Sequence, residues 1–405
     1  MYGTPFNRRR FLTAAGFSGL AALTPVPRAF GTAPAVLVGL DAEFMDRSST
    51  ADDAIQLGAQ VAIDEINERG GVLGGRPLQL VTTDNRSVPA RGVANVKALA
   101  AMPDIVAYLG GKFSPVVLEQ LPHIHTGQLP LLAAWSAADA ITNNRYQPNY
   151  AFRVGLSDQI AMDRLLSEVR LRGLHRVGLM APQTAWGRSF LARLEQRLIS
   201  SRAEDLSLSG VAWHYWGGRE DAMKAGYLSL VANGAEAIIL VANEVEGASL
   251  IREVADQASS LRRPVFSHWG ITGGRFVDLC GARLQDVELV VAQSFSFADL
   301  PSPASRRLAA RGMEHFAEDD PLSIPSMTGI GPAYDIIHLL RLAIETARTA
   351  QRPAVREALE HLPAYSGVVR DFAPAFTAAR HDALGLDDVL LCRFDANRRL
   401  TPLPR

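Results

Sequence analysis

The alternation of strand-like and helix-like segments, which runs through the chain twice, is the feature that most constrains its fold. Short apolar runs are followed in most cases by segments with helical periodicity. The first set of runs lies at residues 35–40, 78–83, 106–109, 129–134 and 150–154. The second set lies at residues 176–180, 206–213, 237–242, 264–267 and 287–296. Strands that alternate with helices favour a parallel sheet flanked by helices, so two sets predict an α/β protein with two doubly wound lobes.

The last quarter of the chain breaks this alternation. Helical patterns at 302–316, 331–350 and 353–362 precede two strand-like pieces at 389–394 and 399–403. Three helices with no strand between them do not make a lobe of their own. We therefore expect this region to pack back onto the two earlier lobes.

Length and charge narrow the class of protein. The chain has 405 residues, of which 48% are hydrophobic and 20% charged, and its formal net charge is −1. This composition predicts a soluble protein of two or three domains. A nearly neutral balance argues against nucleic acid as a partner. No apolar run reaches the roughly 18–20 residues that a membrane-spanning helix needs.

Residues 1–33 have the organisation of an export signal. Arg8-Arg9-Arg10-Phe11-Leu12 precedes an apolar run at 14–23, and small residues follow up to Ala33. The arginine pair followed by x-Phe-Leu predicts a twin-arginine-type signal peptide, and hence the twin-arginine export machinery as a partner. The alternative is a disordered, arginine-rich start. Cys280 and Cys392 are the two cysteines, and both a disulfide between them and two buried free thiols remain open.

One stretch of the first set has the features of an anion-binding turn. The apolar run at 106–109 leads through Gly110-Gly111 to a helix that we expect to begin at Ser114, with Ser114 as N-cap and Pro115 in the first turn. Free amides at such a helix start favour a negatively charged ligand group. The alternative is an ordinary strand-to-helix turn without a ligand.

Tryptophans gather just beyond the predicted strands. Trp135, Trp186 and Trp269 follow three of them, although each of these residues is also suited to core packing. Polar residues follow the strands in the same way, namely Ser136, Asn243, Glu246 and His268. Because ligands of open α/β sheets bind beyond the carboxyl ends of strands, this distribution predicts a small-molecule site between the lobes.

Motifs for catalysis are not found. The sequence contains no Gly-x-x-x-x-Gly-Lys phosphate loop, no Gly-x-Gly-x-x-Gly fingerprint and no Gly-x-Ser-x-Gly nucleophile elbow. His123 and His125 do not have the spacing of a helical metal pair. We expect no catalytic residue, no cofactor and no metal. An exported hydrolase that uses His268 and Glu246 is kept as an alternative.

Taken in order, several segments resemble the type I periplasmic solute-binding proteins of ABC importers, specifically the leucine/isoleucine/valine-binding group. The segments are Ala62-Ile-Asp-Glu-Ile-Asn67, Gly70-Gly-Val-Leu-Gly-Gly-Arg-Pro77, Gly110-Gly111 with Ser114-Pro115, Pro130-Leu-Leu-Ala133, Phe152-Arg153, Trp186-Gly187 and Ala333-Tyr-Asp335. The resemblance implies two α/β lobes joined by a three-crossover hinge. It places the first lobe at 34–154 plus 295–370 and the second lobe at 155–294 plus 371–405.

The resemblance also implies roles for residues of the site. Phe113, Ser114 and the loop Trp135-Ser136-Ala137 correspond to groups around the ligand carboxylate, and Trp186 corresponds to an aromatic residue that covers the ligand. His268-Trp269-Gly270 corresponds to a loop whose acid takes the ammonium group, but no acid is present here. Ala137 stands where amino-acid binders often have Thr. Glu43 and Glu246 are the candidate substitutes for this acid. The ligand is therefore expected to be an amino acid, a related organic acid, an amide or another small solute.

The expected function is that of a periplasmic solute-binding protein. It would capture a small-molecule ligand between the lobes and deliver it to an ABC permease in the inner membrane, without catalysis. A sensory ligand-binding protein that reports to a membrane receptor is an alternative with the same fold.

Overall fold

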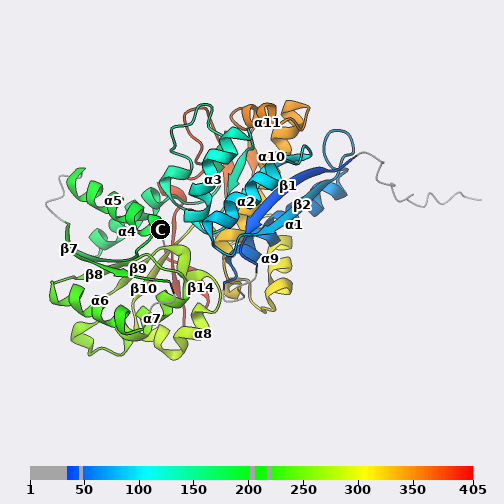
Figure 1. Cartoon of the computed structure of the whole chain (residues 1–405). Coiled ribbons are helices and arrows are strands. Elements are labelled where there is room, and N and C mark those ends of the chain that lie inside the picture. The colour runs from blue at the N-terminus through cyan, green and yellow to red at the C-terminus, as the bar shows by residue number, and fades with distance from the viewer. Residues whose placement is uncertain (1–33, 45–48, 201–205, 217–219, 405) are drawn as a thin grey trace, which may run out of the picture.

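Two α/β lobes lie side by side, and both are built from segments distant in sequence (Figure 1). The computed structural model describes residues 34–44, 49–200, 206–216 and 220–404. The signal segment predicted at 1–33 lies outside these residues. The C-terminal segment ends close to the region where the lobes meet (Figure 1).

The first lobe has a five-stranded, fully parallel sheet with strand order β2-β1-β3-β4-β5. Its strands are β1 (Val36–Ala42), β2 (Leu78–Asp84), β3 (Ile105–Gly110), β4 (Leu131–Ala133) and β5 (Ala151–Arg153). Its helices are α1 (Ala51–Glu68), α2 (Pro89–Ala100), α3 (Ser114–Thr126), α9 (Pro303–Phe316), α10 (Met327–Ala347) and α11 (Arg352–Leu359), and a small hairpin is formed by β11 (Tyr365–Ser366) and β12 (Asp371–Phe372).

The second lobe has a seven-stranded sheet with strand order β14-β13-β10-β9-β8-β6-β7. Its strands are β6 (Arg176–Pro182), β7 (Ser207–His214), β8 (Ala237–Leu240), β9 (Val265–Ser267), β10 (Leu289–Gln293), β13 (Leu390–Phe394) and β14 (Leu400–Pro402). Its helices are α4 (Asp158–Leu171), α5 (Ala185–Ser200), α6 (Glu220–Ala232), α7 (Glu244–Ala255) and α8 (Phe276–Cys280). The pairs β10–β13 and β13–β14 are antiparallel, and the other pairs among the described strands of this sheet are parallel.

Alternating side chains place a core on each face of both sheets. In β4, Leu131 packs in the cluster under α2 and α3, while its neighbour Leu132 packs in the cluster that contains α1 and α10. In β8, Ile238 and Ile239 divide in the same way between the α6–α7 side and the α4–α5 side. This is the packing expected of strands buried on both faces of a parallel sheet. Two doubly wound lobes, as predicted, are therefore confirmed.

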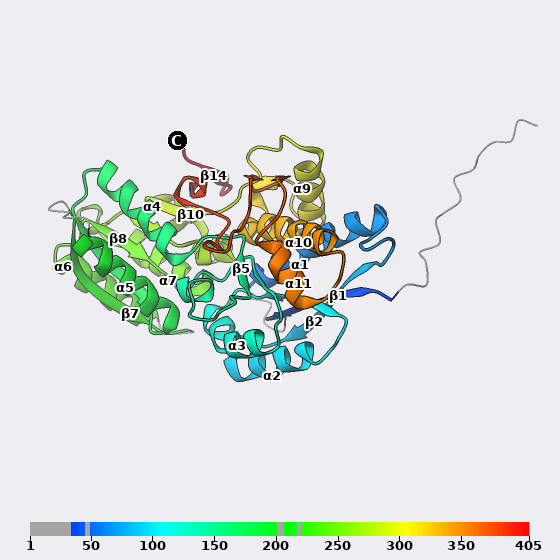
Figure 2. The ribbon, with the colours of Figure 1, turned by 90° about the horizontal axis from the view of Figure 1, so that it is seen from above.

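The chain passes between the lobes three times, between β5 and α4, between β10 and α9, and between β12 and β13. The view from above shows the helices α9 and α10 beside α1, with α11 packed on α10, all away from β10 where the second crossing starts (Figure 2). After β12 the chain still follows the first sheet, because Arg153 N–H donates to the carbonyl of His381 and Asp382 bridges to Arg153. The end of the first lobe that was predicted at residue 370 lies before this contact in the chain. The other predicted limits of the two lobes stay predictions.

Two local predictions are corrected, on the start of α10 and on the role of Ser114. Helix α10 begins at Met327 rather than at Gly331, with Pro332 inside it. Ser114 is the first residue of α3 and does not cap it, and Thr50 makes no side-chain capping bond to α1. Thr50 Oγ1 instead contacts Ser326 Oγ at 2.9 Å and accepts from Gly274 N–H at 2.8 Å. The hydroxyls of Thr50 and Ser326 thus join segments that are far apart in the chain, and the local sequence gives no indication of this contact.

Cys280 and Cys392 are buried free thiols, so of the two alternatives the structure has the unpaired one. Burial raises the pKa of each thiol to about 12, so neither is a thiolate at neutral pH. Among the described residues, no helix combines the length and the apolar character needed to cross a membrane.

Candidate ligand-binding site between the lobes

A small cavity lies where the carboxyl ends of the strands of both lobes face each other. It is lined by Lys112, Phe113, Ser114, Trp135, Ala137, Trp186, Asn243 and His268. The first five belong to the loops after β3 and β4 or to the first residue of α3, and the last three belong to loops or helix starts after β6, β8 and β9. The cavity has a volume of about 20 Å³, room for about one water molecule. A solute therefore enters only when the lobes separate or the aromatic side chains move.

Ser114 connects two loops of the first lobe. Its Oγ accepts hydrogen bonds from the N–H groups of Ala137 and Ala138, at 3.1 and 3.3 Å. Only 4% of Ser114 is exposed. The hydroxyl is thus held at the cavity wall, beside the first turn of α3.

Arg153 also holds the loop at residues 136–138, through the carbonyl groups of that loop. Its fully buried guanidinium donates to the carbonyls of Ser136, Ala137 and Ala138 at 2.9–3.3 Å. Its Nε pairs with Asp382 at 2.6 Å. Because planar N–H groups contact three successive carbonyls, the loop that carries Trp135 and Ala137 is held rigidly.

Lys112 is the ionised residue among those that line the cavity, and the acidic side chains of Asp52, Glu244 and Glu43 lie near it. Its Nζ lies 2.8 Å from Glu43, and its backbone N–H donates to Asp52 at 2.6 Å. Burial lowers the pKa of Lys112, but Asp52, Glu244 and Glu43 outweigh this effect and raise it. Lys112 therefore remains a cation inside the closed cleft.

Aromatic rings bridge the two lobes at the cavity. Trp186 stacks on Trp216 with ring centroids 6.2 Å apart, and Trp216 meets the edge of Phe113 at 5.4 Å. Phe113 belongs to the first lobe and both tryptophans belong to the second. Such pairs add roughly 0.5–1.5 kcal/mol each beyond the burial of their surface. The bridge therefore favours the closed arrangement.

His268 and Asp158 form a buried pair behind Trp186. Trp186 Nε1–H donates to Asp158 Oδ1 at 3.1 Å, and His268 Nε2 lies 3.6 Å from the same oxygen. Burial lowers the pKa of His268 well below its ordinary value. Burial and then the charge of Asp139 raise the pKa of Asp158 to about 8. At neutral pH both groups are therefore uncharged.

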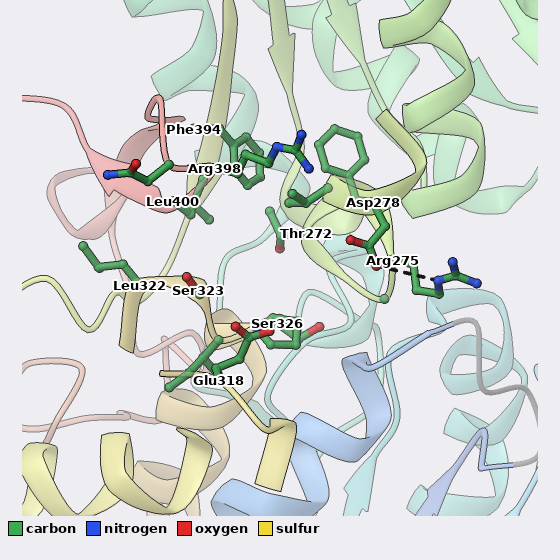
Figure 3. Close-up of a pocket in the computed structure, with 16 residues that line it drawn as sticks. Thr272, Arg275, Asp278, Glu318, Leu322, Ser323, Ser326, Phe394, Arg398 and Leu400 are labelled. Atoms are coloured by element: carbon green, nitrogen blue, oxygen red, sulfur yellow. Dashed lines mark ion pairs between the residues drawn. The ribbon is translucent and has the colours of Figure 1, made fainter. Parts of the chain in front are cut away.

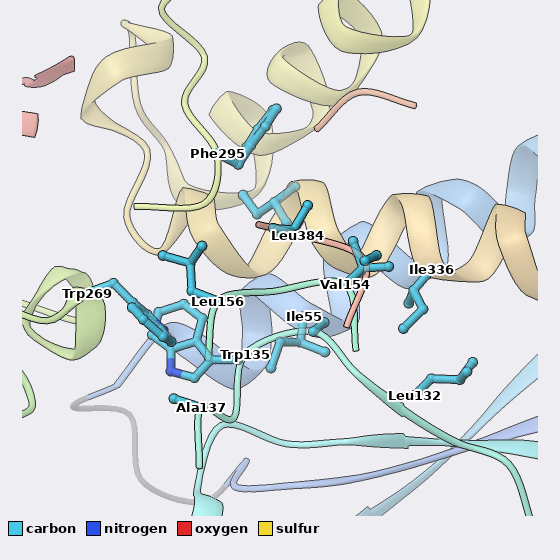
Figure 4. Close-up of a cluster of buried hydrophobic side chains, with 14 of the residues drawn as sticks. Ile55, Leu132, Trp135, Ala137, Val154, Leu156, Trp269, Phe295, Ile336 and Leu384 are labelled. Atoms are coloured by element: carbon cyan, nitrogen blue, oxygen red, sulfur yellow. The ribbon is translucent and has the colours of Figure 1, made fainter. Parts of the chain in front are cut away.

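Seven of the ten residues that the sequence indicated share this cavity, and three do not. Ser136 and Trp269 are fully buried, with Trp269 stacked on His268 and packed in the cluster that also contains Trp135 (Figure 4). Glu246 is buried in the first turn of α7 and does not line the cavity. For Trp269 the core-packing alternative describes its place. The ligand-binding role of the other residues stays a prediction.

The sequence interpretation missed Lys112 and Trp216. Lys112 directly precedes Phe113 in the stretch already singled out, so its position after β3 was a usable signal. Trp216 follows β7 by two residues and obeys the same strand-end rule as the other tryptophans. The sequence gives no indication of a role for Asp158, because its contact with Trp186 depends on the path of the chain between β5 and α4.

A larger cavity of about 290 Å³ lies elsewhere between the lobes, bounded by residues 272–278 and 394–400 of the second lobe and 318–326 of the first (Figure 3). None of the predicted ligand-binding residues lines it. Arg275 and Asp278 at its edge are exposed and pair with each other at 3.8 Å. Among the described residues, no buried polar atom without a partner lies in its wall. The smaller cavity is lined by seven of the predicted residues, one of which, His268, has such an atom, and is therefore the better candidate.

Two doubly wound lobes, three crossings and a cavity at the facing strand ends define a class of two-lobed binding proteins. A family model described as periplasmic binding protein matches residues 47–391. The chain belongs to this family, and the resemblance found in the sequence is confirmed. A search of curated proteins gives no match.

Solved structures show the same fold at low sequence identity. A periplasmic binding protein type 1 from Bordetella pertussis Tohama I is 19% identical, with a TM-score of 0.79 over 92% of this chain and 100% of that chain. A branched-chain amino acid transporter substrate-binding protein from Streptococcus pneumoniae, in complex with isoleucine, is 16% identical, with a TM-score of 0.71 over 91% and 100%. An ABC transporter solute-binding protein from R. palustris, in complex with benzoate, is 16% identical, with a TM-score of 0.74 over 91% and 95%.

Proposed function

We propose that this protein binds a small carboxylate-bearing solute between its lobes and delivers it to an ABC permease in the inner membrane. The observation that carries the proposal is the cavity itself, because side chains from both lobes converge on it at the strand ends. A solute that touches both lobes stabilises the closed arrangement by its contacts with each. Closure is then the signal that distinguishes loaded from empty protein.

The composition of the cavity supports a binding role rather than a catalytic one. Aromatic walls and a few polar groups are typical of sites for small molecules. The hydrolase alternative required His268 and Glu246 to act together, but Glu246 does not line the cavity with His268. Neutral His268 faces no nucleophile among the lining residues, since Ser114 belongs to the opposite wall and contacts backbone amides.

The structural neighbours support a carboxylate ligand. One is bound to isoleucine and another to benzoate, two solutes that share a carboxylate and an apolar body. In this chain, Lys112 and Ser114 offer donors at one wall, and Phe113, Trp135 and Trp186 offer apolar surface. We infer that the carboxylate lies against the first group and the apolar body against the second.

The site of action that we propose is the periplasm. The family supports this location, and the twin-arginine-type signal at 1–33 is a sequence-based part of the proposal. Export is tested by fractionating cells that produce the full chain, with Arg8→Lys and Arg9→Lys together as the variant. Loss of the periplasmic form in this variant is expected, and an unchanged periplasmic fraction would contradict the twin-arginine route.

Binding is tested by titrating the purified protein with amino acids and organic acids while tryptophan fluorescence is recorded. We expect at least one solute to change the emission and to bind with a Kd of about 1 μM, roughly −8 kcal/mol. No response to a broad panel, in protein shown to be folded by circular dichroism, would count against the proposal.

A further inference from the structure

We propose that Thr50, at the start of α1, joins the two lobes in the closed protein and sets how long a captured solute is retained, although it does not line the ligand cavity. Its partners are Gly274 of the second lobe and Ser326 of the first. The effect on a solute rests on the proposed function, whereas the contact between the lobes involves no ligand.

The hydroxyl of Thr50 connects α1 to the opposite lobe. Its Oγ1 accepts from the N–H of Gly274 at 2.8 Å and lies 2.9 Å from Ser326 Oγ. A hydroxyl has two lone pairs and one hydrogen, so the bond from Gly274 leaves the hydrogen available for Ser326. Thr50 makes no side-chain capping bond to its own helix. Its hydroxyl therefore serves contacts outside α1, and the one with Gly274 crosses between the lobes.

The backbone of Ser326 makes a second bond between the lobes. Its N–H donates to the carbonyl of Thr272 in the second lobe at 3.0 Å. Ser326 is buried, and its φ of +57° lies in the left-handed region, which is unfavourable for a residue with a side chain. Such a conformation persists where the surrounding contacts hold it. For Ser326 these contacts include the opposite lobe.

The loop that carries Gly274 fits closely against the first lobe. A Cβ on Gly273 would lie 3.2 Å from Glu244 Oε2 and 3.6 Å from both Ser326 Oγ and Ser49 Oγ. The position without a side chain thus allows polar groups of both lobes to approach one another. Ser49 of the first lobe donates to Glu244 of the second, which is a further hydrogen bond between the lobes.

These three interlobe bonds, made by Thr50, Ser326 and Ser49, act on the exit of a solute more than on its entry. The cavity has a volume of about 20 Å³, so a captured solute leaves when the lobes separate. A separation at this point breaks the interlobe bonds. Entry occurs while the lobes are apart and the bonds are not formed. Loss of one bond should therefore raise the dissociation rate and leave the association rate nearly unchanged.

The test is Thr50→Val, which keeps the shape of the side chain and removes its hydroxyl. The N–H of Gly274 then has no acceptor on Thr50 in the closed arrangement, and a buried donor without a partner is costly. With a solute that binds wild type, we expect the dissociation rate and the Kd to rise about fivefold or more, and the association rate to stay within about twofold. Stopped-flow tryptophan fluorescence gives the rates, and calorimetry gives the Kd.

The matched control is Thr83→Val, because Thr83 Oγ1 donates to Asp41 at 2.9 Å within the first lobe. This variant loses a hydroxyl of the same kind and should keep the dissociation rate of wild type, whatever its thermal stability. Thr50→Ser retains the hydroxyl and should also keep slow dissociation. If Thr50→Val does not fold, Ser326→Ala replaces it, with an expected rise in dissociation rate of about twofold or more.

The outcomes separate this inference from the proposed function. If Thr50→Val releases the solute no faster than Thr83→Val, the inference is overturned and the proposed function stands. If no solute of the panel binds wild type, the proposed function fails, and small-angle X-ray scattering of the ligand-free proteins decides the inference. A larger radius of gyration in Thr50→Val than in wild type and Thr83→Val supports the interlobe bond, and equal radii overturn it.

Discussion

Asp158 combines complete burial with a contact to the residue that covers the cavity. Its carboxyl accepts from Trp186, and burial followed by the charge of Asp139 raises its pKa from 3.8 to about 8. The folded protein therefore holds a proton on Asp158 over a pH range in which the unfolded chain has lost it. Stability that depends on this proton is complete at about pH 4 and falls as the pH rises toward about 8.

Asp158→Asn is expected to remove this pH dependence. The amide keeps an oxygen for Trp186 Nε1–H but has no proton to lose, so the variant should gain stability relative to wild type as the pH rises from about 5 to 8. The measurement is the difference in thermal unfolding midpoint across this range, where each kcal/mol corresponds to roughly 2–4 °C. A difference that does not change with pH would contradict the assigned protonation of Asp158.

Arg153 shows how one residue determines the shape of a loop. Arg153→Lys retains the charge but has no planar N–H groups for the three carbonyls and Asp382. We expect a loss of about 2–4 kcal/mol in the free energy of unfolding, measured by urea denaturation. The control is Arg170→Lys, since Arg170 is exposed at the end of α4, and its effect should stay within about 0.5 kcal/mol. Equal effects of both substitutions would show that the buried contacts contribute little.

At the scale of elements, the close crossing of α1 and α10 holds the N-terminal and C-terminal parts of the first lobe together. A Cβ on Gly58 would lie 2.2 Å from the carbonyl oxygen of Ile330, which is backbone and cannot rotate away. A glycine in a helix is otherwise unfavourable relative to alanine. Its presence in α1 is therefore explained by the close approach of α10.

Gly58→Ala is expected to destabilise the protein by about 1–3 kcal/mol, despite the higher helix propensity of alanine. Chemical denaturation is the measurement. Glu68→Ala, on the exposed end of the same helix, is the matched control and should change stability by no more than about 0.5 kcal/mol. If Gly58→Ala proved as stable as the control, the helices would have to be further apart than the structure has them.

The elements were the part of this protein that sequence predicted best. Runs of apolar residues between helical patterns located the strands of both sheets, because strands buried on both faces leave a strong local signal. The start of α10 was misplaced because Pro332 favours a helix start locally, whereas packing on α1 extends the helix to Met327. In the candidate site, strand-end positions located Ser114, Trp186 and His268. Contacts through the first crossing, such as that of Asp158, have no local signature.

At the scale of the whole molecule, aromatic rings of both lobes are in contact. Trp216 lies between Phe113 of the first lobe and Trp186 of the second. Trp213, in the same strand region, is 36% exposed. The emission of the two residues should therefore respond differently to a ligand that changes the relation of the lobes.

Trp216→Phe is expected to remove at least about half of the fluorescence change that a bound ligand produces, because ring contacts across the cleft are what the ligand alters. Trp213→Phe is the control and should leave the amplitude of the change near that of wild type. Affinity is measured in parallel by calorimetry, so that a weaker signal is not mistaken for weaker binding. Equal amplitudes in both variants would exclude a rearrangement of the aromatic bridge on binding.

The three crossings have a consequence for how this chain can be divided. The first lobe includes the helices α9, α10 and α11, which follow β10 in the chain. The second sheet includes β13 and β14, which lie at the end of the chain. Neither lobe is a continuous stretch of polypeptide, so no single cut releases an intact half. A chain that stops near residue 360 lacks two strands of the second lobe and the segment of the first lobe that pairs with Arg153. Synthesis of the full chain must therefore be almost finished before either lobe is complete.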